Sequence, residues 1–457
     1  MSRDIDRRKL LKGIGGATIF GLAGCVTQSP DDGGGGDGTA TTTETERETV
    51  KPIDIGDGGQ SDGDDSDSDG GGGGGERTVR LGILMPETGD LASVGQPIRD
   101  GALLPATQLE DADVPITVDT QVEDTATDPQ QGIQAANALV NAGYPMVTGP
   151  ASSGVNLQVS QQVFIPNQVV GCSPSSTSPT VTGLNDDDFV FRTAPSDALQ
   201  GQVMAQVADE TLGHSTASTM YVNNDYGQAL SESFVSSFRD EHSGSINETV
   251  AFEKEQGSYT SQLETALSDS PDLLVIIGYP ASGIQMFRDF YADFADSDVE
   301  ILVTDGLKDP ALPDEVGNEM ANVTGTAPLA SGPGRDFYDQ LYEEEFGEAP
   351  GVFTAQAYDA SAVMILANTY AGENSGTAVR DALREVANPE GETMGPGDLP
   401  EAVEMAANGE AINYAGASSS VNFDDNGDMV AVSYEYFGFN TSMENNIEQL
   451  DTIQFGQ

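Results

Sequence analysis

Tryptophan is absent from the 457-residue sequence, and histidine and cysteine occur only twice each. With so few imidazole and thiol groups, the sequence offers few ligands for a metal site and few groups for nucleophilic catalysis. From residue 78 onward there is also no Gly-x-Ser-x-Gly turn, no His-Glu-x-x-His pattern and no phosphate-binding glycine loop. These absences argue against an enzyme, and they give no reason to expect a cofactor or a bound metal.

Basic residues are also scarce, because 18 Lys and Arg stand against 75 Asp and Glu, for a formal charge of −57. Nucleic-acid binding is therefore not expected, since phosphates are bound through Lys and Arg. At low salt such a charge repels itself, whereas at molar salt the Debye length falls to about 3 Å. The acids extend into the folded part, as at 343–345. We interpret them as adaptation to very high salt, as in halophilic archaea; an acidic linker on an ordinary domain is the alternative.

The two cysteines are not expected to pair, because Cys25 belongs to an N-terminal signal over residues 1–25. This signal has a twin-arginine pattern at Arg7 and Arg8, an apolar stretch over 14–22, and Leu-Ala-Gly before Cys25. It predicts export by the twin-arginine route and a lipid on the Cys25 thiol, which would anchor the protein to the outer face of the cell membrane. A buried N-terminal helix or a plain anchor helix is the alternative. Cys172 is interpreted as a buried thiol.

Residues 26–77 consist largely of Asp, Gly, Ser and Thr. A segment with so little apolar content cannot bury enough surface to offset the entropy of ordering. We expect a disordered acidic tether between the lipid and the folded domain. Further along, triplets that begin at Asn247, Asn322 and Asn440 fit the N-glycosylation pattern of an exported protein.

From residue 78 the sequence alternates between short β-rich runs and helical stretches. The predicted strands are 79–85, 116–122, 145–148, 169–171, 218–223, 246–252, 273–278 and 300–303, and the predicted helices are 97–110, 129–141, 154–164, 228–239, 261–267 and 282–294. Such alternation is typical of parallel sheets with helices on both faces. Two sets of units, before and after Pro195, predict an α/β protein with two doubly wound lobes.

Ligands of such sheets bind outside the carboxyl ends of the strands. The predicted loops at those ends are rich in Gly, Ser, Thr, Asp and Tyr: 86–94, 149–154, 173–179, 223–227, 278–282 and 304–308. These residue types suit hydrogen bonds to a small polar ligand, although each loop alone is also compatible with a simple helix cap.

Several ordered segments carry a resemblance to a known family. They include Ile83–Gly89, Glu123-Asp124, Gly149–Gly154, Cys172–Pro179, Phe191–Thr193, Asp225–Gly227, Ile277–Tyr279, Asp305-Gly306, Ala357–Ala360 and Phe423–Asp428. In this order and spacing the chain resembles, over residues 78 to 440, the branched-chain amino-acid-binding family of type I periplasmic solute-binding proteins of ABC transporters. The leucine/isoleucine/valine-binding protein exemplifies this family.

The resemblance implies two lobes joined by a hinge with three chain crossings. Lobe one would comprise 78–194 and 328–417, and lobe two 195–327 and 418–457. It further implies a monomer that captures an amino acid, of branched-chain type, by hinge closure and delivers it to an ABC permease in the membrane. A ligand-sensing receptor subunit of the same fold and a binder of urea or short amides are the alternatives.

The family's site carries over to residues at the predicted strand ends. Ser153 and Thr177 are expected to hydrogen-bond the ligand carboxylate, with help from backbone N–H groups at helix starts. Ser175 is expected to offer its backbone carbonyl to the ligand ammonium. Asp305 matches the acidic residue that pairs with the ammonium, although an Asp-Gly pair is also a common turn.

Tyr226 and Tyr279 are expected to close over the ligand from lobe two, unless they are ordinary interface aromatics. The sequence departs from the family at two positions. Val94 stands where an aromatic residue often packs on the ligand side chain, and Asp305 is shorter than the usual Glu. Both departures keep other amino acids, urea and amides open as ligands. Residues 422–433 hint at a calcium loop, but Ser433 replaces its final Glu, so we predict a hairpin turn.

Overall fold

The computed structural model describes residues 77–110, 112–388, 390–443 and 445–455. The predicted export signal, the lipid site at Cys25 and all but the last residue of the predicted tether lie outside them. Among the helices of the described part, none combines the length and the apolar character that crossing a bilayer requires.

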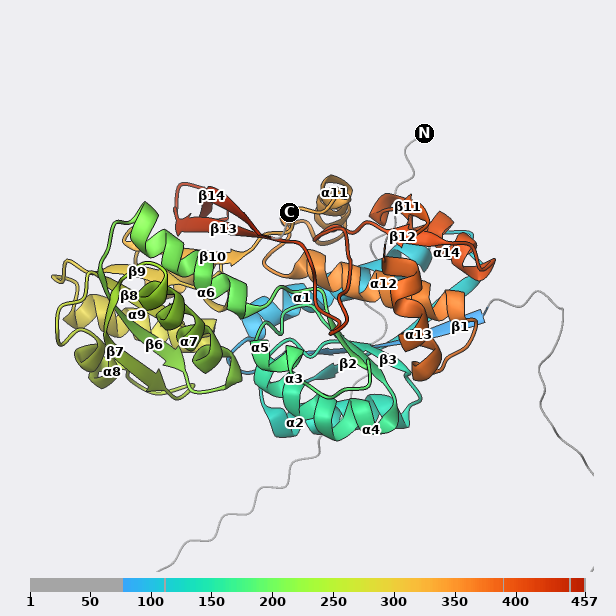
Figure 1. Cartoon of the computed structure of the whole chain (residues 1–457), viewed down its shortest axis with the longest axis horizontal. Helices are drawn as coiled ribbons and strands as arrows, with labels where there is room; N and C mark the ends of the chain where they lie inside the picture. The colour runs from blue at the N-terminus through green and yellow to red at the C-terminus, as the bar shows by residue number, and fades with distance from the viewer. Residues whose placement is uncertain (1–76, 111, 389, 444, 456–457) are drawn as a thin grey trace, which may run out of the picture. The chain divides into compact units, whose positions relative to one another are not determined.

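Within the described residues, the first sheet has parallel strands in the order β2-β1-β3-β4-β5. These are β1 (Arg77–Met85), β2 (Ile116–Asp124), β3 (Met146–Thr148), β4 (Val170–Ser173) and β5 (Val190–Arg192). Strands β1, β2 and β3 are labelled in Figure 1. Between the strands run α1 (Ala92–Glu110), α2 (Pro129–Asn141), α3 (Ser153–Val159), the π-helical segment η1 (Ser160–Phe164), α4 (Ile165–Asn167) and α5 (Pro179–Thr182). This is the parallel α/β alternation that the sequence predicts.

Strand β1 shows how side chains place the helices on both faces of this sheet. Its side chains point alternately to opposite faces. Val79, Leu81 and Ile83 join the core that includes α1, whereas Leu84 joins a separate core with Leu139 of α2. Helices α1 and α12 therefore cover one face, and α2 and α3 cover the other (Figure 1).

The second sheet has the strand order β14-β13-β10-β9-β8-β6-β7 in the described chain. Its strands are β6 (Thr216–Val222), β7 (Ser245–Phe252), β8 (Leu273–Ile277), β9 (Glu300–Val303), β10 (Val323–Pro328), β13 (Val432–Phe439) and β14 (Ile447–Phe455). The helical segments between its parallel strands are α6 (Asp197–Gln206), η2 (Val207–Thr211), α7 (Asp225–Asp240), α8 (Thr260–Ala266), α9 (Pro280–Asp293), η3 (Asp305–Leu307) and α10 (Leu312–Val316).

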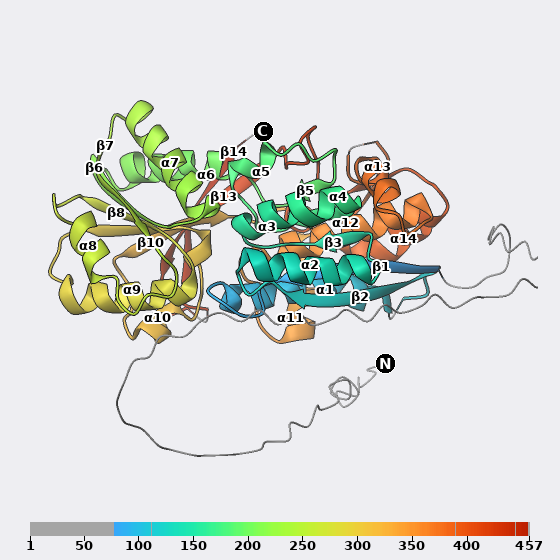
Figure 2. The same ribbon diagram turned by 90° about the horizontal axis from the view of Figure 1, so that it is seen from below.

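This second sheet is mixed rather than purely parallel, which differs from the prediction of a parallel sheet in each lobe. Strand β13 pairs antiparallel with β10, and β14 pairs antiparallel with β13. Helices α6 and α7 cover one face of the sheet, and α8 and α9 cover the other (Figure 2). The alternation rule does not reach β13 and β14, because no helix separates them.

The chain passes between the two sheets three times. The first crossing follows β5 and leads to the second sheet. The second crossing follows β10 and leads back to α11 (Arg335–Phe346), α12 (Thr354–Ala371), α13 (Gly376–Ala387), β11 (Glu392–Met394), η4 (Pro396–Asp398), α14 (Leu399–Ala407) and β12 (Ile412–Tyr414). The third crossing leads from β12 into β13 of the second sheet. Helix α12 packs on the first sheet against β1, β3 and β4 and is buried over almost its whole length (Figure 1). We call the first sheet with α11–α14 the first lobe, and the second sheet with its helices the second lobe.

The third crossing is fixed by a buried arginine of the first lobe. The Arg192 side chain at the end of β5 is fully buried, and its Nε and Nη2 donate to the two carboxylate oxygens of Asp428 at 2.5 and 2.8 Å. Its Nη1 donates to the carbonyls of Ser176 and Ser178. Asp428 lies in a turn closed by an antiparallel bridge between residues 423 and 429, so the prediction of a hairpin turn here is confirmed.

A buried carboxylate holds the start of the same crossing. Asp359 of α12 accepts hydrogen bonds from the Tyr414 hydroxyl, the backbone N–H groups of Ala417 and Ser418, and the Ser418 hydroxyl. Burial raises the pKa of Asp359 to about 6 although these donors oppose the shift. A side chain at Gly416 would clash with this carboxylate, because its Cβ would lie 2.3 Å from an Asp359 oxygen. The glycine therefore permits the close approach of crossing and helix.

Candidate binding site

A small cavity lies between the lobes at the carboxyl ends of their strands. It is lined by Leu91, Val94, Ile98, Ala151, Ser152, Ser153, Ser175, Tyr226, Tyr279, Asp305, Gly306, Val352 and Phe353. The space open to the centre of a water molecule is about 20 Å³, which is room for about one water. A solute of amino-acid size therefore needs the lining to move apart before it enters.

Several hydrogen bonds join the two lobes near this cavity. The Ser282 hydroxyl contacts both carboxylate oxygens of Asp90 at 2.9 Å, and the Ser93 hydroxyl donates to Asp309 at 2.6 Å. The Lys254 ammonium donates to the carbonyl of Thr127 at 2.7 Å. Each of these contacts joins residues of different lobes, so the structure has the lobes closed on each other.

Asp305, the first residue of the short helical segment η3 after β9, supplies a carboxyl group to the cavity wall. Its Oδ1 accepts hydrogen bonds from Gln200 Nε2 at 2.8 Å and from the Tyr226 hydroxyl at 3.2 Å. Burial raises the pKa of Asp305 to about 6, and the two hydrogen bonds act in the opposite direction. A cationic group of a ligand beside this carboxylate would stabilise its charged form, in place of the water that burial has removed.

A second buried carboxyl group, Asp197, lies near Asp305 at the start of α6. Burial, followed by the negative charge of Asp305, raises the pKa of Asp197 well above its usual range. Two carboxylates that share one poorly solvated region cannot both ionise easily. The pair therefore retains a proton to higher pH than an isolated carboxyl group would.

Tyr226 and Tyr279 form an aromatic pair from the second lobe. Their rings are stacked at a centroid distance of 5.6 Å with an interplanar angle of 12°. The Tyr226 hydroxyl contacts Thr304 Oγ1 at 2.8 Å as well as Asp305. The Tyr279 hydroxyl lies 3.3 Å from Ser152 Oγ of the first lobe and accepts a hydrogen bond from Asn224 Nδ2 at 3.1 Å. The pair thus joins the acidic wall to the hydroxyl wall.

The predicted hydroxyl residues of the first lobe are placed differently from one another. Ser153 and Ser175 both line the cavity, and the Ser153 hydroxyl accepts a hydrogen bond from the backbone N–H of Ser178 at 3.2 Å. Thr177 is not among the lining residues, and its hydroxyl donates to Asp197 Oδ2 at 3.0 Å. In this closed arrangement Thr177 therefore contacts the acidic pair rather than the cavity.

One wall of the cavity is apolar. Leu91, Val94 and Ile98 come from α1 and the loop before it, and Val352 and Phe353 come from the segment before α12. Phe353 has a φ of 62°, a left-handed conformation that bulky residues rarely adopt. Our sequence reasoning missed Val352 and Phe353, because they precede a helix and follow no strand. The available signal was an apolar pair directly after Pro350-Gly351.

A protein-family model described as periplasmic binding protein matches residues 78–412. The chain belongs to the periplasmic binding protein family. Among its curated relatives, the chemotactic signal transduction system substrate-binding protein BasB of Halobacterium salinarum is 27% identical over 356 residues, which cover 72% of this chain and 83% of that protein. The leucine-, isoleucine-, valine-, threonine- and alanine-binding protein of Pseudomonas aeruginosa is 24% identical over 67% of this chain and 82% of its own length.

A solved structure, the leucine-binding protein LivK of Thermotoga maritima, matches with a TM-score of 0.69 and 24% identity, over 82% of this chain and 98% of that chain. At this identity the match shows the fold, which is that of type I periplasmic binding proteins. The relatives are solute-binding proteins. The expectations of a solute-binding role and of no enzymatic activity are therefore confirmed for this periplasmic binding protein.

Proposed function

We propose that this family member binds an α-amino acid with an aliphatic side chain, of branched-chain type, between its lobes. The observation that carries the proposal is the buried carboxyl of Asp305 on one wall of a cavity whose opposite wall presents Ser153 and Ser175. An ammonium suits the acid, and a carboxylate suits neutral hydroxyl and N–H donors. We propose that Thr177 is also one of the donors to the ligand carboxylate, and that it contacts the ligand in another state of the hinge.

The apolar wall supports an aliphatic side chain. Leu91, Val94 and Ile98 with Val352 and Phe353 offer only carbon surface to the cavity. Each buried methylene of a ligand side chain is worth about 0.8 kcal/mol against such a wall. The names of the relatives, with leucine, isoleucine and valine among their ligands, point the same way.

Calorimetric titration of the full chain in molar KCl tests the proposal. The panel comprises leucine, isoleucine, valine, glutamate, urea and acetamide. We expect the three branched-chain amino acids to bind and glutamate to fail, because a second carboxylate would enter the apolar wall. Binding of urea or acetamide alone would overturn the assignment of Asp305 to an ammonium and would favour the amide-binding alternative.

We further propose that hinge closure delivers the solute to an ABC permease, from lobes comprising 78–194 with 328–417 and 195–327 with 418–457. A ligand that contacts both lobes favours the closed state over the open one. One relative favours the sensory alternative, since BasB is named for chemotactic signal transduction. Deletion of the gene separates the two roles: loss of labelled leucine uptake supports the importer, whereas normal uptake with lost chemotaxis toward leucine supports the sensor.

Export and anchoring complete the proposal. The family name is consistent with a location outside the cytoplasm, and we propose twin-arginine export with a lipid on Cys25. Cys25→Ser is expected to move the protein from the membrane fraction to the medium, because one thioether-linked lipid anchor is lost. Replacement of both Arg7 and Arg8 by Lys is expected to retain the chain in the cytoplasm. Unchanged fractionation of either variant would contradict its part of the proposal.

A further inference from the structure

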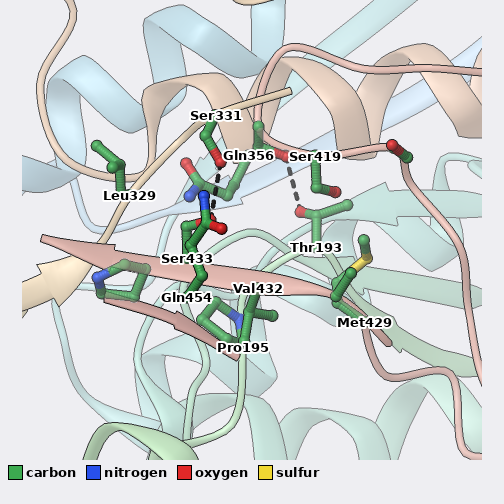
Figure 3. Close-up of a pocket in the computed structure, with 14 residues that line it drawn as sticks. Thr193, Pro195, Leu329, Ser331, Gln356, Ser419, Met429, Val432, Ser433 and Gln454 are labelled. Atoms are coloured by element: carbon green, nitrogen blue, oxygen red, sulfur yellow. Dashed lines mark hydrogen bonds between the residues drawn. The ribbon is translucent and has the colours of Figure 1, made fainter. Parts of the chain in front are cut away.

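Figure 3 shows part of the hinge, where the chain passes between the lobes. The Ser331 hydroxyl of the second crossing donates to Ser433 Oγ at the start of β13, with an O···O distance of 3.0 Å. The Thr193 hydroxyl of the first crossing donates to the carbonyl of Gln356 at 2.8 Å. Contacts at a hinge can persist while the lobes rotate about it. Contacts that join one lobe directly to the other beside the solute cavity are lost on opening, so they determine how easily the lobes close.

Asp90 is an acidic residue in one of these direct contacts between the lobes. It lies in the turn before α1 of the first lobe and is 2% exposed. The Ser282 hydroxyl of the second lobe lies 2.9 Å from both oxygens of its carboxylate. The backbone carbonyl of Asp90 also accepts a hydrogen bond from the Ala281 N–H at 3.3 Å. Opening the lobes would separate these partners and return the carboxylate to water.

The turn that carries Asp90 is fixed to the first lobe. Gly89, the residue before it, has a φ of 83°, and a Cβ there would lie 2.3 Å from the carbonyl oxygen of Ala126. The N–H of Leu91, the residue after it, donates to Thr127 Oγ1 at 3.2 Å. The backbone of Asp90 is therefore held where closure of the lobes buries its side chain.

The buried carboxylate of Asp90 has little compensation for its charge. Lys254 and Glu255 of the second lobe act on it with opposite signs, and the Lys254 ammonium donates to the carbonyl of Thr127 at 2.7 Å instead. Burial raises the pKa of Asp90, although Ser282 and Lys254 oppose the shift. A carboxyl group whose pKa rises on closure favours its neutral form in the closed state. The negative charge of Asp90 therefore works against closure.

We propose that the charge of Asp90 limits the affinity for the solute, because closure of the lobes has to bury this charge beside a serine. Asp90 is not among the residues that line the solute cavity, so it acts through the equilibrium between the open and closed states. A shift toward the closed state raises the apparent affinity of any ligand that binds this state. The solute in this inference rests on the proposed function, whereas closure itself can be measured without a solute.

Calorimetric titration of the full chain with leucine, in molar KCl at pH 7.5, tests the proposal with two variants. Asp90→Asn removes the charge and keeps an oxygen for the Ser282 hydroxyl, so we expect the affinity to rise by at least about threefold. Ser282→Ala removes the hydroxyl donor and leaves the charge, so we expect the affinity to fall by about tenfold.

A double variant and a control isolate the charge. In the Asp90→Asn background, Ser282→Ala should lower the affinity by only about threefold, because the lost hydrogen bond is then one between neutral groups. Asp113→Asn changes the net charge equally at an exposed site of the same lobe, and it should bind leucine as the wild type does. An equal gain of affinity in Asp113→Asn would overturn the proposal.

The pH dependence separates an effect of charge from an effect of shape. Protonated Asp90 is neutral, as asparagine is, so the ratio of the Asp90→Asn affinity to the wild-type affinity should fall toward one between pH 8 and pH 4. Asp305 is present in both proteins, and so are Lys254, Glu255 and Tyr279, the titratable neighbours of Asp90 in the second lobe. A ratio that does not change with pH would contradict the role of the charge.

Hydrogen–deuterium exchange of the ligand-free full chain, read by mass spectrometry on peptides that contain residues 281–283, measures closure without a solute. We expect slower exchange in Asp90→Asn and faster exchange in Ser282→Ala, because the Ala281 N–H is bonded to Asp90 in the closed state. Equal or reversed exchange rates in the two variants would overturn the proposal, as would a leucine affinity that Asp90→Asn leaves unchanged.

Failure of leucine to bind any of these proteins would contradict the proposed function, and the exchange rates would then decide the role of Asp90 alone. Circular dichroism and the unfolding temperature establish that each variant is folded. If Asp90→Asn does not fold, Asp90→Ser provides the neutral side chain and should change both measurements in the same direction.

Discussion

Asp305 is the residue from which a pH dependence of solute binding follows. Its pKa is raised to about 6 by burial, and a bound ammonium would favour the charged form and lower this pKa again. Below about pH 6 a proton therefore competes with the ligand. We expect the affinity for leucine to be constant above pH 7 and to fall by up to about tenfold per pH unit below pH 6, as measured by calorimetric titration between pH 4.5 and 8.

Asp305→Asn is the matching variant. It removes the charge and should weaken leucine binding at pH 7 by at least about tenfold, because a buried ammonium loses its partner. Asp314→Asn is the control, since Asp314 is an exposed residue of the same lobe. A wild-type affinity that is unchanged from pH 8 to 5 would show that Asp305 does not bind an ammonium.

Tyr226 tunes the same carboxyl group through a hydrogen bond. The Tyr226 hydroxyl lowers the pKa of Asp305, so its removal should raise that pKa further. We expect Tyr226→Phe to shift the acid limb of the leucine-binding profile to higher pH. Tyr279→Phe is the control: Tyr279 stacks on Tyr226, but its hydroxyl bonds to Ser152 and Asn224 instead. Equal shifts in both variants would contradict this role.

The predicted loops after the strands, together with the family resemblance, indicated most of the cavity lining but not Asp197, the acidic neighbour of Asp305. Polar residues after parallel strands meet at one sheet edge, which is why Ser153, Ser175 and Asp305 could be placed together. Thr177 instead donates to Asp197. The contact between Thr177 and Asp197 depends on how the first crossing enters α6, and no spacing in the sequence encodes that path. The ligand-binding roles of Ser153, Ser175, Thr177 and Asp305 remain predictions.

At the scale of elements, the Arg192–Asp428 pair ties β5 to the third crossing. We expect Asp428→Asn to lower the free energy of unfolding by about 3 kcal/mol, because the fully buried guanidinium loses the charge of its partner. Denaturant unfolding in molar KCl measures this change. Asp425→Asn is the control, as Asp425 is exposed in the same turn, and an equal effect of the two variants would contradict the argument.

Elements with a continuous apolar run were the most predictable. The run over 273–278 gave β8 (Leu273–Ile277) to within one residue, since a strand buried on both faces needs no polar positions. The helix predicted from residue 97 begins at Ala92 instead, with Pro97 and Pro105 inside it. Its packing on α12, where Gly101 lies against the carbonyl of Thr354, offsets a proline cost that local propensity treats as decisive.

For the whole molecule, charge determines the response to salt. The 18 basic residues can neutralise at most 18 of the 75 acidic ones, which leaves 75 − 18 = 57 unpaired charges. We expect the unfolding temperature to rise between 0.1 and 2 M KCl as screening removes repulsion, by about 2–4 °C for each kcal/mol gained. Sucrose at matched osmolality is the control and should act more weakly. Equal effects would argue against adaptation to high salt.

The three crossings also constrain how the protein can be made. During synthesis, α11 to α14 leave the ribosome after β10 and before β13. The edge of β10 that pairs with β13 in the finished sheet therefore stays unpaired while these elements of the first lobe are synthesised. A nascent chain that stalls in this interval is not a smaller binding protein, because it exposes unpaired strand N–H and C=O groups to other chains. Synthesis thus leaves the molecule most vulnerable to aggregation just before its last two strands emerge.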